Sequence, residues 1–220
     1  MYYSLLATEQ NARGARSQKI AGNSVITDFG ESEVERERAF SLLSLIDLSP
    51  FPRAGIKGSG LSQWIESKPY DVGTESNRAY VQRDGVLIAR LSPGELMLLS
   101  DTADPSTDKL TSPPNATYQC YPVSRQDSHY WFAVTGAHSP AMFAKLCGVD
   151  LSPNNFADLS IAQTSVARTS AIIVRHDIKD MLCYYLLGDS STILYMWTCV
   201  VDAMNEFDGR MLGLRALENP

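Results

Sequence analysis

Short runs of alternating apolar and polar residues cover most of this chain, and glycine or proline ends many of them. From Phe40 to Leu48 the larger apolar side chains recur at a period of two, which predicts a half-buried strand. Apolar runs bounded by turn residues predict the other strands. They lie at 53–58, 85–91, 96–99, 118–125, 130–135, 166–175 and 183–187. Many short strands with few helices between them predict an α+β protein.

One stretch combines a strand, a bend and a helix. Residues 131–135 predict the strand, Gly136 the bend, and Ser139 the N-cap of a helix with Pro140 at its first position. Gly148 predicts a left-handed stop to that helix. Residues 53–65 repeat the order of strand, glycine and helix. A last helix is predicted from a cap at Ser190 or Ser191 to a stop at Gly209, because its apolar residues share one face.

The two halves of the chain match each other at three places. These are Gly58 before Trp64 with Gly136 before Phe143, Ile88–Arg90 with Ile173–Arg175, and Leu98–Asp101 with Leu186–Asp189. Each half therefore reads β-β-α-β-β, with a clear closing helix only in the second. We predict one domain over residues 38–212, made of two subdomains (about 38–104 and 118–209) related by a pseudo-two-fold axis. Residues 101–117, which carry three prolines, are predicted to connect them.

The two ends of the chain are less patterned. Residues 1–37 predict an N-terminal arm, whose first 30 residues are mobile or ordered only against a partner. The alternating charges of residues 31–38 fit either a turn of helix or a solvated strand edge. Residues 213–220 predict a C-terminal tail.

Composition excludes several classes of function. A net charge of −6 and a pI near 5.1 argue against a nucleic-acid partner, which needs a basic face. No apolar run approaches the roughly 20 residues that span a bilayer, and the N-terminus has no signal-peptide pattern. The four cysteines are widely spaced and lie among apolar residues, which is typical of buried thiols in a reducing compartment. We expect a cytoplasmic protein without a membrane partner.

Catalytic motifs are equally sparse. Residues 55–60 are glycine-rich but lack both the dinucleotide and the P-loop spacing, so they predict a tight turn. The three histidines sit in predicted turns without metal-ligand spacing, and no serine lies in a nucleophile elbow. From these patterns we expect no catalytic residue and no metal site in this chain.

Three residues are candidates for contacts with a ligand or a partner. Arg168 is predicted on a largely apolar strand face, where its charge needs a counter-ion. That counter-ion is a ligand carboxylate, an acid of another subunit or an internal acid, and the latter two are favoured. Tyr130 and Trp131 are of the type that anchors protein interfaces, although burial in the core is the default for each. Arg90 and Arg175 end equivalent strands, which favours a shared structural role.

Several segments together resemble a known family. They are Arg90–Leu99, Val134–Gly136, Ala144–Leu151, Ile161–Arg175 and the helix over Trp197–Phe207. The layout is similar to the folate-binding fold of the glycine cleavage T-protein, an aminomethyltransferase. More closely, the chain resembles the gamma subunit of heterotetrameric sarcosine oxidase, over about residues 38–212.

Departures from the T-protein pattern shape what the resemblance implies. T-proteins carry paired aspartates, one of them catalytic, near the place of Ile88 and Ala89 in this chain. The resemblance therefore implies a noncatalytic structural subunit with no cofactor of its own, in a complex that oxidises sarcosine to glycine. FAD, FMN, NAD and tetrahydrofolate would then lie in partner flavoprotein subunits. The alternatives are a stand-alone folate-binding protein of one-carbon metabolism, or a gamma-like subunit of another N-methyl amine oxidase.

Overall fold

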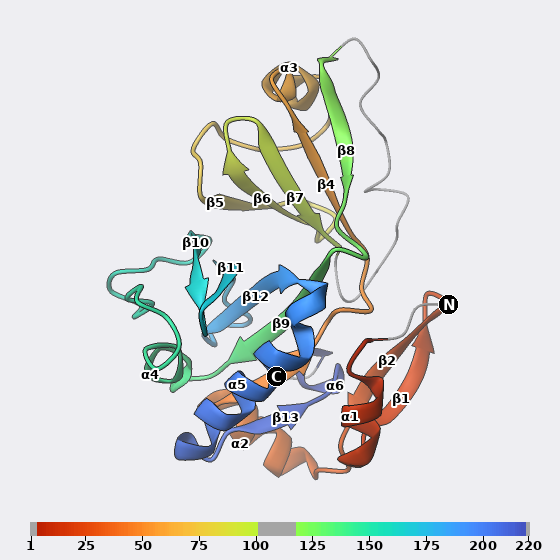
Figure 1. The fold of residues 1–220 in the computed structure, drawn as a ribbon, viewed down its shortest axis with the longest axis vertical. Coiled ribbons are helices and arrows are strands. Elements are labelled where there is room, and N and C mark those ends of the chain that lie inside the picture. Colours follow the sequence, from red (N-terminus) through yellow and green to blue (C-terminus); the bar gives the residue numbers. More distant parts are fainter. Residues whose placement is uncertain (1–3, 101–117, 219–220) are drawn as a thin grey trace.

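Two large, mainly antiparallel sheets lie one above the other in the computed structural model, and a two-stranded sheet lies beside the lower one (Figure 1). The structure describes residues 4–100 and 118–218. The upper, five-stranded sheet has α3 (Leu61–Glu66) against it, and the lower, six-stranded sheet has α4 (Ser139–Phe143) and α5 (Ile193–Met204). The upper order is β5 (Arg78–Val81), β6 (Leu87–Ser92), β7 (Glu95–Leu99), β4 (Arg53–Gly58), β8 (Cys120–Ser124). The lower order is β10 (Ile161–Val166), β11 (Thr169–Arg175), β12 (Cys183–Asp189), β9 (His129–Thr135), β3 (Ser44–Asp47), β13 (Arg210–Leu212). Only β13 pairs in parallel, with β3.

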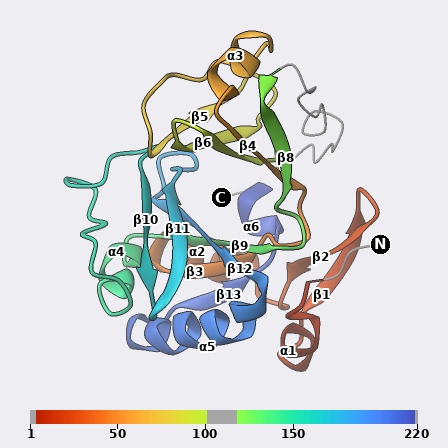
Figure 2. The ribbon, with the colours of Figure 1, turned by 45° about the horizontal axis from the view of Figure 1, so that its top comes forward.

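The pseudo-two-fold relation is visible in single hydrogen bonds. Where β5 and β10 meet (Figure 2), Ala79 N donates to Leu159 O (2.8 Å) and Ile161 N donates to Asn77 O (2.9 Å). Asn77 and Leu159 both have a left-handed backbone (φ 59° and 63°). Each also donates its N–H to the carbonyl of an arginine, Arg90 and Arg175 respectively. The two equivalent bonds place the local two-fold axis between them.

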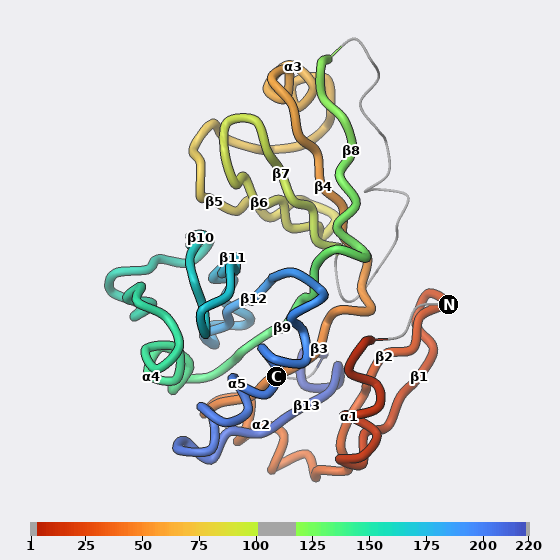
Figure 3. The backbone as a smooth tube through the Cα atoms, viewed as in Figure 1, coloured from red at the N-terminus to blue at the C-terminus, as the bar shows by residue number. Residues whose placement is uncertain are grey.

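The two sheets exchange one strand each. β3 precedes β4 in the chain but pairs with β9 of the lower sheet, and β8 precedes β9 but pairs with β4 of the upper sheet. The chain therefore crosses between the sheets twice, side by side (Figure 3). Neither sheet is complete with residues from one half of the sequence alone. The connection predicted over residues 101–117 lies outside the described residues.

Arg53 holds the two crossings together. Arg53 is 3% exposed. Its guanidinium donates to the carbonyls of Ser49 (2.7 Å) and Phe51 (2.8 Å) in one crossing. In the other crossing it donates to the carbonyls of Gln126 (2.8 Å) and His129 (2.9 Å). Hydrogen bonds from a charged donor are stronger than neutral ones, so this side chain is a main link between the segments.

Arginines Arg90 and Arg175 have the shared structural role that the sequence predicts. Both are buried, and each binds the loop between the helix and the hairpin of its own half. Arg90 Nη1 donates to Gly73 O (2.8 Å), and Arg175 Nη1 donates to Phe156 O (2.7 Å).

The strand–glycine–helix elements are confirmed, with corrections to their ends. Gly58 and Gly136 have positive φ (154° and 101°), and a Cβ at either would lie 2.3–2.5 Å from backbone atoms. Ser139 is not the N-cap, since the helix begins at Ser139 and His138 precedes it without a side-chain cap. The amides of residues 137–139 donate instead to the backbone carbonyls of Ser41, Leu42 and Gly136. The helix ends at Phe143, and Gly148 is not left-handed, so the predicted stop is wrong.

The predicted strand over 166–175 is instead the second arm of a hairpin. β10 ends at Val166, and β11 begins at Thr169. Ala167 and Arg168 form a two-residue turn with φ of 46° and 65°. No glycine or asparagine marks this turn. The sequence therefore carries no signal for the turn that separates the two strands of the hairpin.

The closing helix also differs at its ends. Asp189, not Ser190 or Ser191, accepts the capping bond, from Ser191 N (2.8 Å). The helix α5 ends at Met204, and after the turn η4 (Asn205–Phe207) the left-handed residue is Asp208 (φ 53°), not Gly209.

The N-terminal segment contains regular structure where the sequence predicts a mobile arm. Helix α1 (Ala7–Ala12) and the hairpin of β1 (Arg16–Ile20) and β2 (Asn23–Asp28) pack on the lower half. Buried Asp47 accepts hydrogen bonds from Ser4 and from Gln10 (2.8 Å). Asp28 forms ion pairs with Arg16 (3.3 Å) and with Arg215 (3.0 Å) of the C-terminal helix α6 (Arg215–Glu218). The division into arm, domain and tail stays a prediction.

Residues 31–48 correct a second expectation. The alternating charges belong to α2 (Glu33–Leu42), which opens with a capping box between Ser32 and Glu35. The strand predicted from Phe40 starts only at Ser44, because Phe40 and Leu42 belong to the end of the helix. The window from Phe40 to Leu48 joins the end of this helix to the start of β3, so its period of two does not belong to a single strand.

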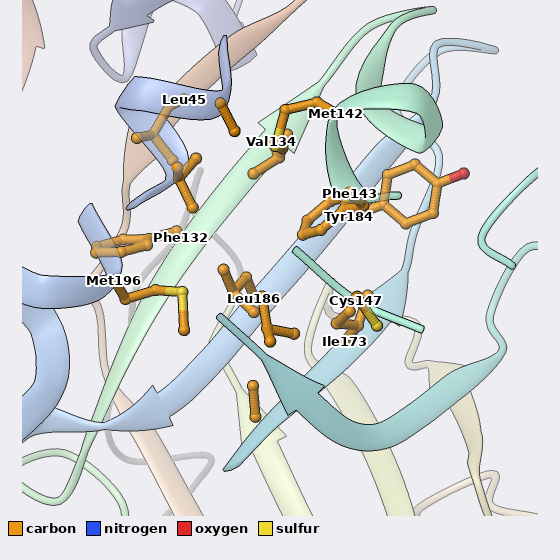
Figure 4. Packing of buried hydrophobic residues seen from close by; sticks show 14 of the residues in the cluster. Leu45, Phe132, Val134, Met142, Phe143, Cys147, Ile173, Tyr184, Leu186 and Met196 are labelled. Carbon is orange, nitrogen blue, oxygen red and sulfur yellow. The ribbon is translucent and has the colours of Figure 1, made fainter. Parts of the chain in front are cut away.

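Aromatic and aliphatic side chains fill the layer between the lower sheet and its helices (Figure 4). Phe143 of α4 meets Tyr184 of β12 at 5.7 Å between ring centroids, and Phe132 of β9 meets Trp197 of α5 at 5.6 Å. A second cluster lies between the sheets, and a third lies under α3 around Trp64. No helix in the described ranges is long and apolar enough to cross a membrane.

Candidate functional site between the two sheets

A small cavity lies between the two sheets, and residues of both line it. Its volume is about 170 Å³. The upper sheet contributes Gly85, Leu87, Leu99 and Ser100, the lower sheet Trp131 and Tyr185, the turn after β11 His176 and Ile178, and α6 Leu217. The cavity is therefore built from segments distant in sequence, and the last helix helps to form its wall.

Three lining residues carry buried polar atoms with no hydrogen-bond partner among the described residues. These atoms are Ser100 Oγ, Trp131 Nε1 and His176 Nδ1. A buried polar atom without a partner costs about 1–3 kcal/mol, so each of these three atoms calls for an explanation. All three atoms can donate a hydrogen bond. The cavity can thus take water or a small molecule that offers acceptor atoms.

The electrostatics leave His176 neutral. Burial lowers the pKa of its imidazole, and this effect outweighs the opposing charges of Asp158 and Asp177. One of these acids is already engaged: Asp177 forms a two-pronged ion pair with Arg175, at 3.0 and 2.6 Å. Its Oδ1 also accepts from Cys183 N. The ion pair fixes the end of β11 beside the cavity.

The place that the sequence resemblance assigns to the T-protein acids holds apolar side chains. Ile88 and Ala89 lie in the middle of β6, and both are fully buried. Ile88 packs in the cluster under α3, whereas Ala89 packs in the cluster between the sheets. Among the described residues that line the cavity, no carboxylate is available to move a proton.

The fit to folate can be tested on size. Sites for ligands of drug size occupy about 300–1,000 Å³, well above the 170 Å³ of this cavity. The described cavity does not fit a folate.

The sequence candidates fall in three different places. Trp131 lines the cavity and is 1% exposed, with Tyr185 edge-on at 5.2 Å. Tyr130 points to the opposite face of the lower sheet, where its ring stacks on Phe132 at 4.7 Å and burial raises the pKa of its hydroxyl. Arg168 is exposed at the β10–β11 turn, so its predicted place on a strand face is wrong. The structure does not bring these residues together, and their part in binding stays a prediction.

Ser100 and His176 were not among the candidates identified from the sequence. The sequence placed His176 in a turn without metal-ligand spacing, and in the structure its ring packs against Tyr185 at 5.6 Å between centroids. One signal was present in the internal repeat. His176 directly follows Arg175 and Ser100 directly follows Leu99, and both of these residues end strands that the repeat aligns. Only the stacking of the two sheets brings those ends to one cavity.

Another histidine, His129, lies in a polar network outside the cavity. Arg125 Nη1 contacts His129 Nε2 (3.0 Å), and Arg125 also binds Glu95 of β7. Burial, together with the charges of Arg125 and Arg53, lowers the pKa of His129 to about 4. Because Arg125 can only donate, Nε2 is the acceptor and the proton is on Nδ1, facing Ser128 Oγ (2.8 Å). This ring cannot activate Ser128 as a nucleophile.

No cluster of metal ligands occurs in the described ranges.

Solved structures similar to this chain include an aminomethyltransferase and a chain of a sarcosine oxidase. Glycine cleavage system aminomethyltransferase T from Bartonella henselae matches with a TM-score of 0.78 at 14% identity, over 98% of this chain and 60% of that chain. The fold is that of an aminomethyltransferase. A chain of heterotetrameric sarcosine oxidase from Corynebacterium sp. U-96, in complex with pyrrole 2-carboxylate, matches with a TM-score of 0.61 at 17% identity. That match covers 80% of this chain and 92% of the oxidase chain.

These likenesses confirm the resemblance inferred from the sequence at the level of fold. The chain spans 60% of the length of the aminomethyltransferase, and most of the length of the oxidase chain. No protein-family model matches the sequence, and no curated protein matches it significantly. At these identities the shared fold says nothing by itself about activity.

Proposed function

We propose that this chain is a noncatalytic structural subunit of a sarcosine oxidase-like complex. Such a complex oxidatively demethylates sarcosine to glycine, with hydrogen peroxide and formaldehyde or methylenetetrahydrofolate as the other products. The observation that carries the proposal is the likeness to a chain of a heterotetrameric sarcosine oxidase over 92% of that chain's length. A match over nearly the whole oxidase chain favours an equivalent subunit over an enzyme that needs further domains.

The interior of the fold supports a noncatalytic role. Ile88 and Ala89 are buried apolar residues where a T-protein carries its acids, and the cavity beside them is small. A carboxylate is the usual group for proton transfer at such a site. In this proposal FAD, FMN, NAD and tetrahydrofolate are bound by the partner flavoprotein subunits, and this chain contributes architecture.

Co-expression tests the proposal. The tagged chain would be produced with the flavin-containing subunits of such a complex from the same genome, and the purified material examined for stoichiometric flavoprotein by absorbance at 450 nm. We expect a stable complex that oxidises sarcosine, with activity that depends on the partner subunits. A stable monomer without affinity for those subunits would contradict the proposal.

Calorimetry separates the alternative of a stand-alone folate-binding protein, which rests on the likeness to the aminomethyltransferase. Titration of the isolated chain with tetrahydrofolate should give no saturable heat. Saturable micromolar binding would favour that alternative. Activity of the complex on a different N-methyl amine, with none on sarcosine, would identify the chain as a gamma-like subunit of another oxidase.

A further inference from the structure

The outward side of α5 is poor in charge. Its residues Leu194 and Tyr195 are 51% and 49% exposed, and Thr198 beside them is exposed. Asp202 is the one charged residue in the whole helix. Helices on the surface of a soluble protein usually carry charged residues on their outer face. This face of α5 is therefore unusual for a surface that meets only water.

The β10–β11 turn extends this surface. Tyr195 Oη donates to Ala167 O (2.9 Å), and Ala167 N donates to Leu146 O (2.8 Å) just beyond α4. A third bond, from Thr169 Oγ1 to Val166 O (3.1 Å), closes the turn. These bonds join the end of α4, the turn and α5 into one surface. We call Leu146, Ala167, Arg168, Leu194, Tyr195 and Thr198 the α5 face.

Arg168 supplies the positive charge of the α5 face. It is exposed, and no carboxylate of the described residues forms an ion pair with it. The chain as a whole has a net charge of −6, so an unpaired guanidinium here stands out against an acidic background. It directly follows Ala167, whose carbonyl accepts the hydrogen bond from Tyr195 Oη, so the turn places Arg168 next to α5.

The turn also holds Arg168 in place before any partner arrives. Ala167 and Arg168 both have a left-handed backbone, which is unfavourable for a residue with a side chain. The three hydrogen bonds maintain this conformation. A contact residue fixed in advance loses less entropy on binding. Tyrosine and arginine are the residue types that most often dominate binding energy at interfaces.

We propose that the α5 face is the surface through which this chain docks on a partner protein chain, at a patch where the partner presents an acidic side chain beside apolar ones. The inference rests on the proposed function, since it takes the partner to be a subunit of the oxidase-like complex. Arg168 pairs with the partner's carboxylate, and Leu194 and Tyr195 are covered by its apolar groups.

The experiment compares two arginines in equivalent settings. Arg83 is exposed in the turn between β5 and β6 of the upper sheet, so Arg83→Glu reverses the same charge away from the α5 face. Binding of each purified variant to the immobilised flavoprotein subunits would be measured by biolayer interferometry at 50 and 300 mM NaCl. We expect Arg168→Glu to raise Kd at least 10-fold at low salt, and Arg83→Glu to change it less than 2-fold.

Two further measurements keep the test decisive. Tyr195→Phe removes the bond to Ala167 O but keeps the apolar ring, and should raise Kd several-fold. Thermal unfolding must give Arg168→Glu and Arg83→Glu the same Tm, so that misfolding does not imitate a lost contact.

The outcomes separate the two proposals. If the wild-type chain does not bind the flavoprotein subunits, the proposed function fails and the docking face fails with it. If the wild type binds and Arg168→Glu binds as well as Arg83→Glu, only the docking face is wrong. Sedimentation that shows a wild-type dimer abolished by Arg168→Glu would assign the α5 face to a second copy of this chain instead.

Discussion

The upper and lower halves share their framework but differ in what surrounds it. Both have a positive-φ glycine before the helix, a buried arginine that binds the following loop, and the same strand order. The lower half adds β13, α5 and the N-terminal hairpin, and its Arg175 has a carboxylate partner where Arg90 has only neutral ones. Features present twice hold the fold together. Features present once, such as the α5 face, are where a function specific to this chain is to be sought.

The largest effect is expected when the two halves are produced as separate fragments. Fragments 1–100 and 118–220 each lack one strand of their main sheet, because β3 and β8 are exchanged. We expect neither fragment to fold alone, and the co-expressed pair to assemble into a 1:1 complex with the circular dichroism of the whole chain. Size-exclusion chromatography and circular dichroism measure this. A folded, monomeric fragment would show that the halves are independent domains.

A substitution at Arg53 tests how much this side chain stabilises the two segments that cross between the sheets. Arg53→Met keeps much of the volume but leaves the carbonyls of Ser49, Phe51, Gln126 and His129 without this donor. We expect a loss of about 3–5 kcal/mol in the free energy of unfolding, since bonds from a charged donor contribute about 1.5–3 kcal/mol each and do not add fully. Urea denaturation measures it. Arg83→Met, at an exposed turn, is the control and should change stability by less than about 0.5 kcal/mol.

The paired glycines test the symmetry itself. Gly58→Ala and Gly136→Ala each force a Cβ against backbone atoms at a positive φ. We expect similar losses of about 2–4 kcal/mol, because both strain and overlap contribute. Gly14 has φ 83° with open space around it, so Gly14→Ala should cost only about 1 kcal/mol. Clearly unequal losses at Gly58 and Gly136 would mean that only one half needs a glycine for the close approach of two backbone segments.

The smallest predicted effect concerns pH. The folded pKa of His129 is about 4, below the value near 6.5 of an unfolded histidine. Between pH 6.5 and 4 the unfolded chain binds a proton that the folded chain does not, so the free energy of unfolding falls as the pH falls. Below pH 4 both states are protonated, and His129 adds no further loss. The partly exposed ring limits the effect to about 1–2 kcal/mol.

Urea denaturation from pH 4 to 7 measures this loss, and His129→Gln is the comparison. The variant should lose less stability than the wild type over that interval. An unchanged slope would show that other groups cause the acid sensitivity.

Hydrophobic period and turn residues predicted much of the framework. The strand over Arg53–Gly58 and the helix after it, the strands predicted at 85–91 and 96–99, and the return strand from Cys183 all lie close to where the pattern puts them. These elements are local, since their signals are alternation and a nearby glycine or proline. The internal repeat, and with it the aminomethyltransferase fold, was likewise readable, because equivalent residues such as Arg90 and Arg175 do equivalent work.

Only the tertiary structure decided the rest. The exchange of β3 and β8 leaves no mark in a local pattern, because a strand reads the same whichever sheet it joins. The N-terminal segment looked unordered because its outer strand β1 faces solvent, and its order comes from distant partners such as Asp47 and Arg215. The cavity of Ser100, Trp131 and His176, and the union of Arg168 with α5, arise from contacts between segments far apart in the chain. Sequence by itself determined the elements, and packing over long range determined where their side chains meet.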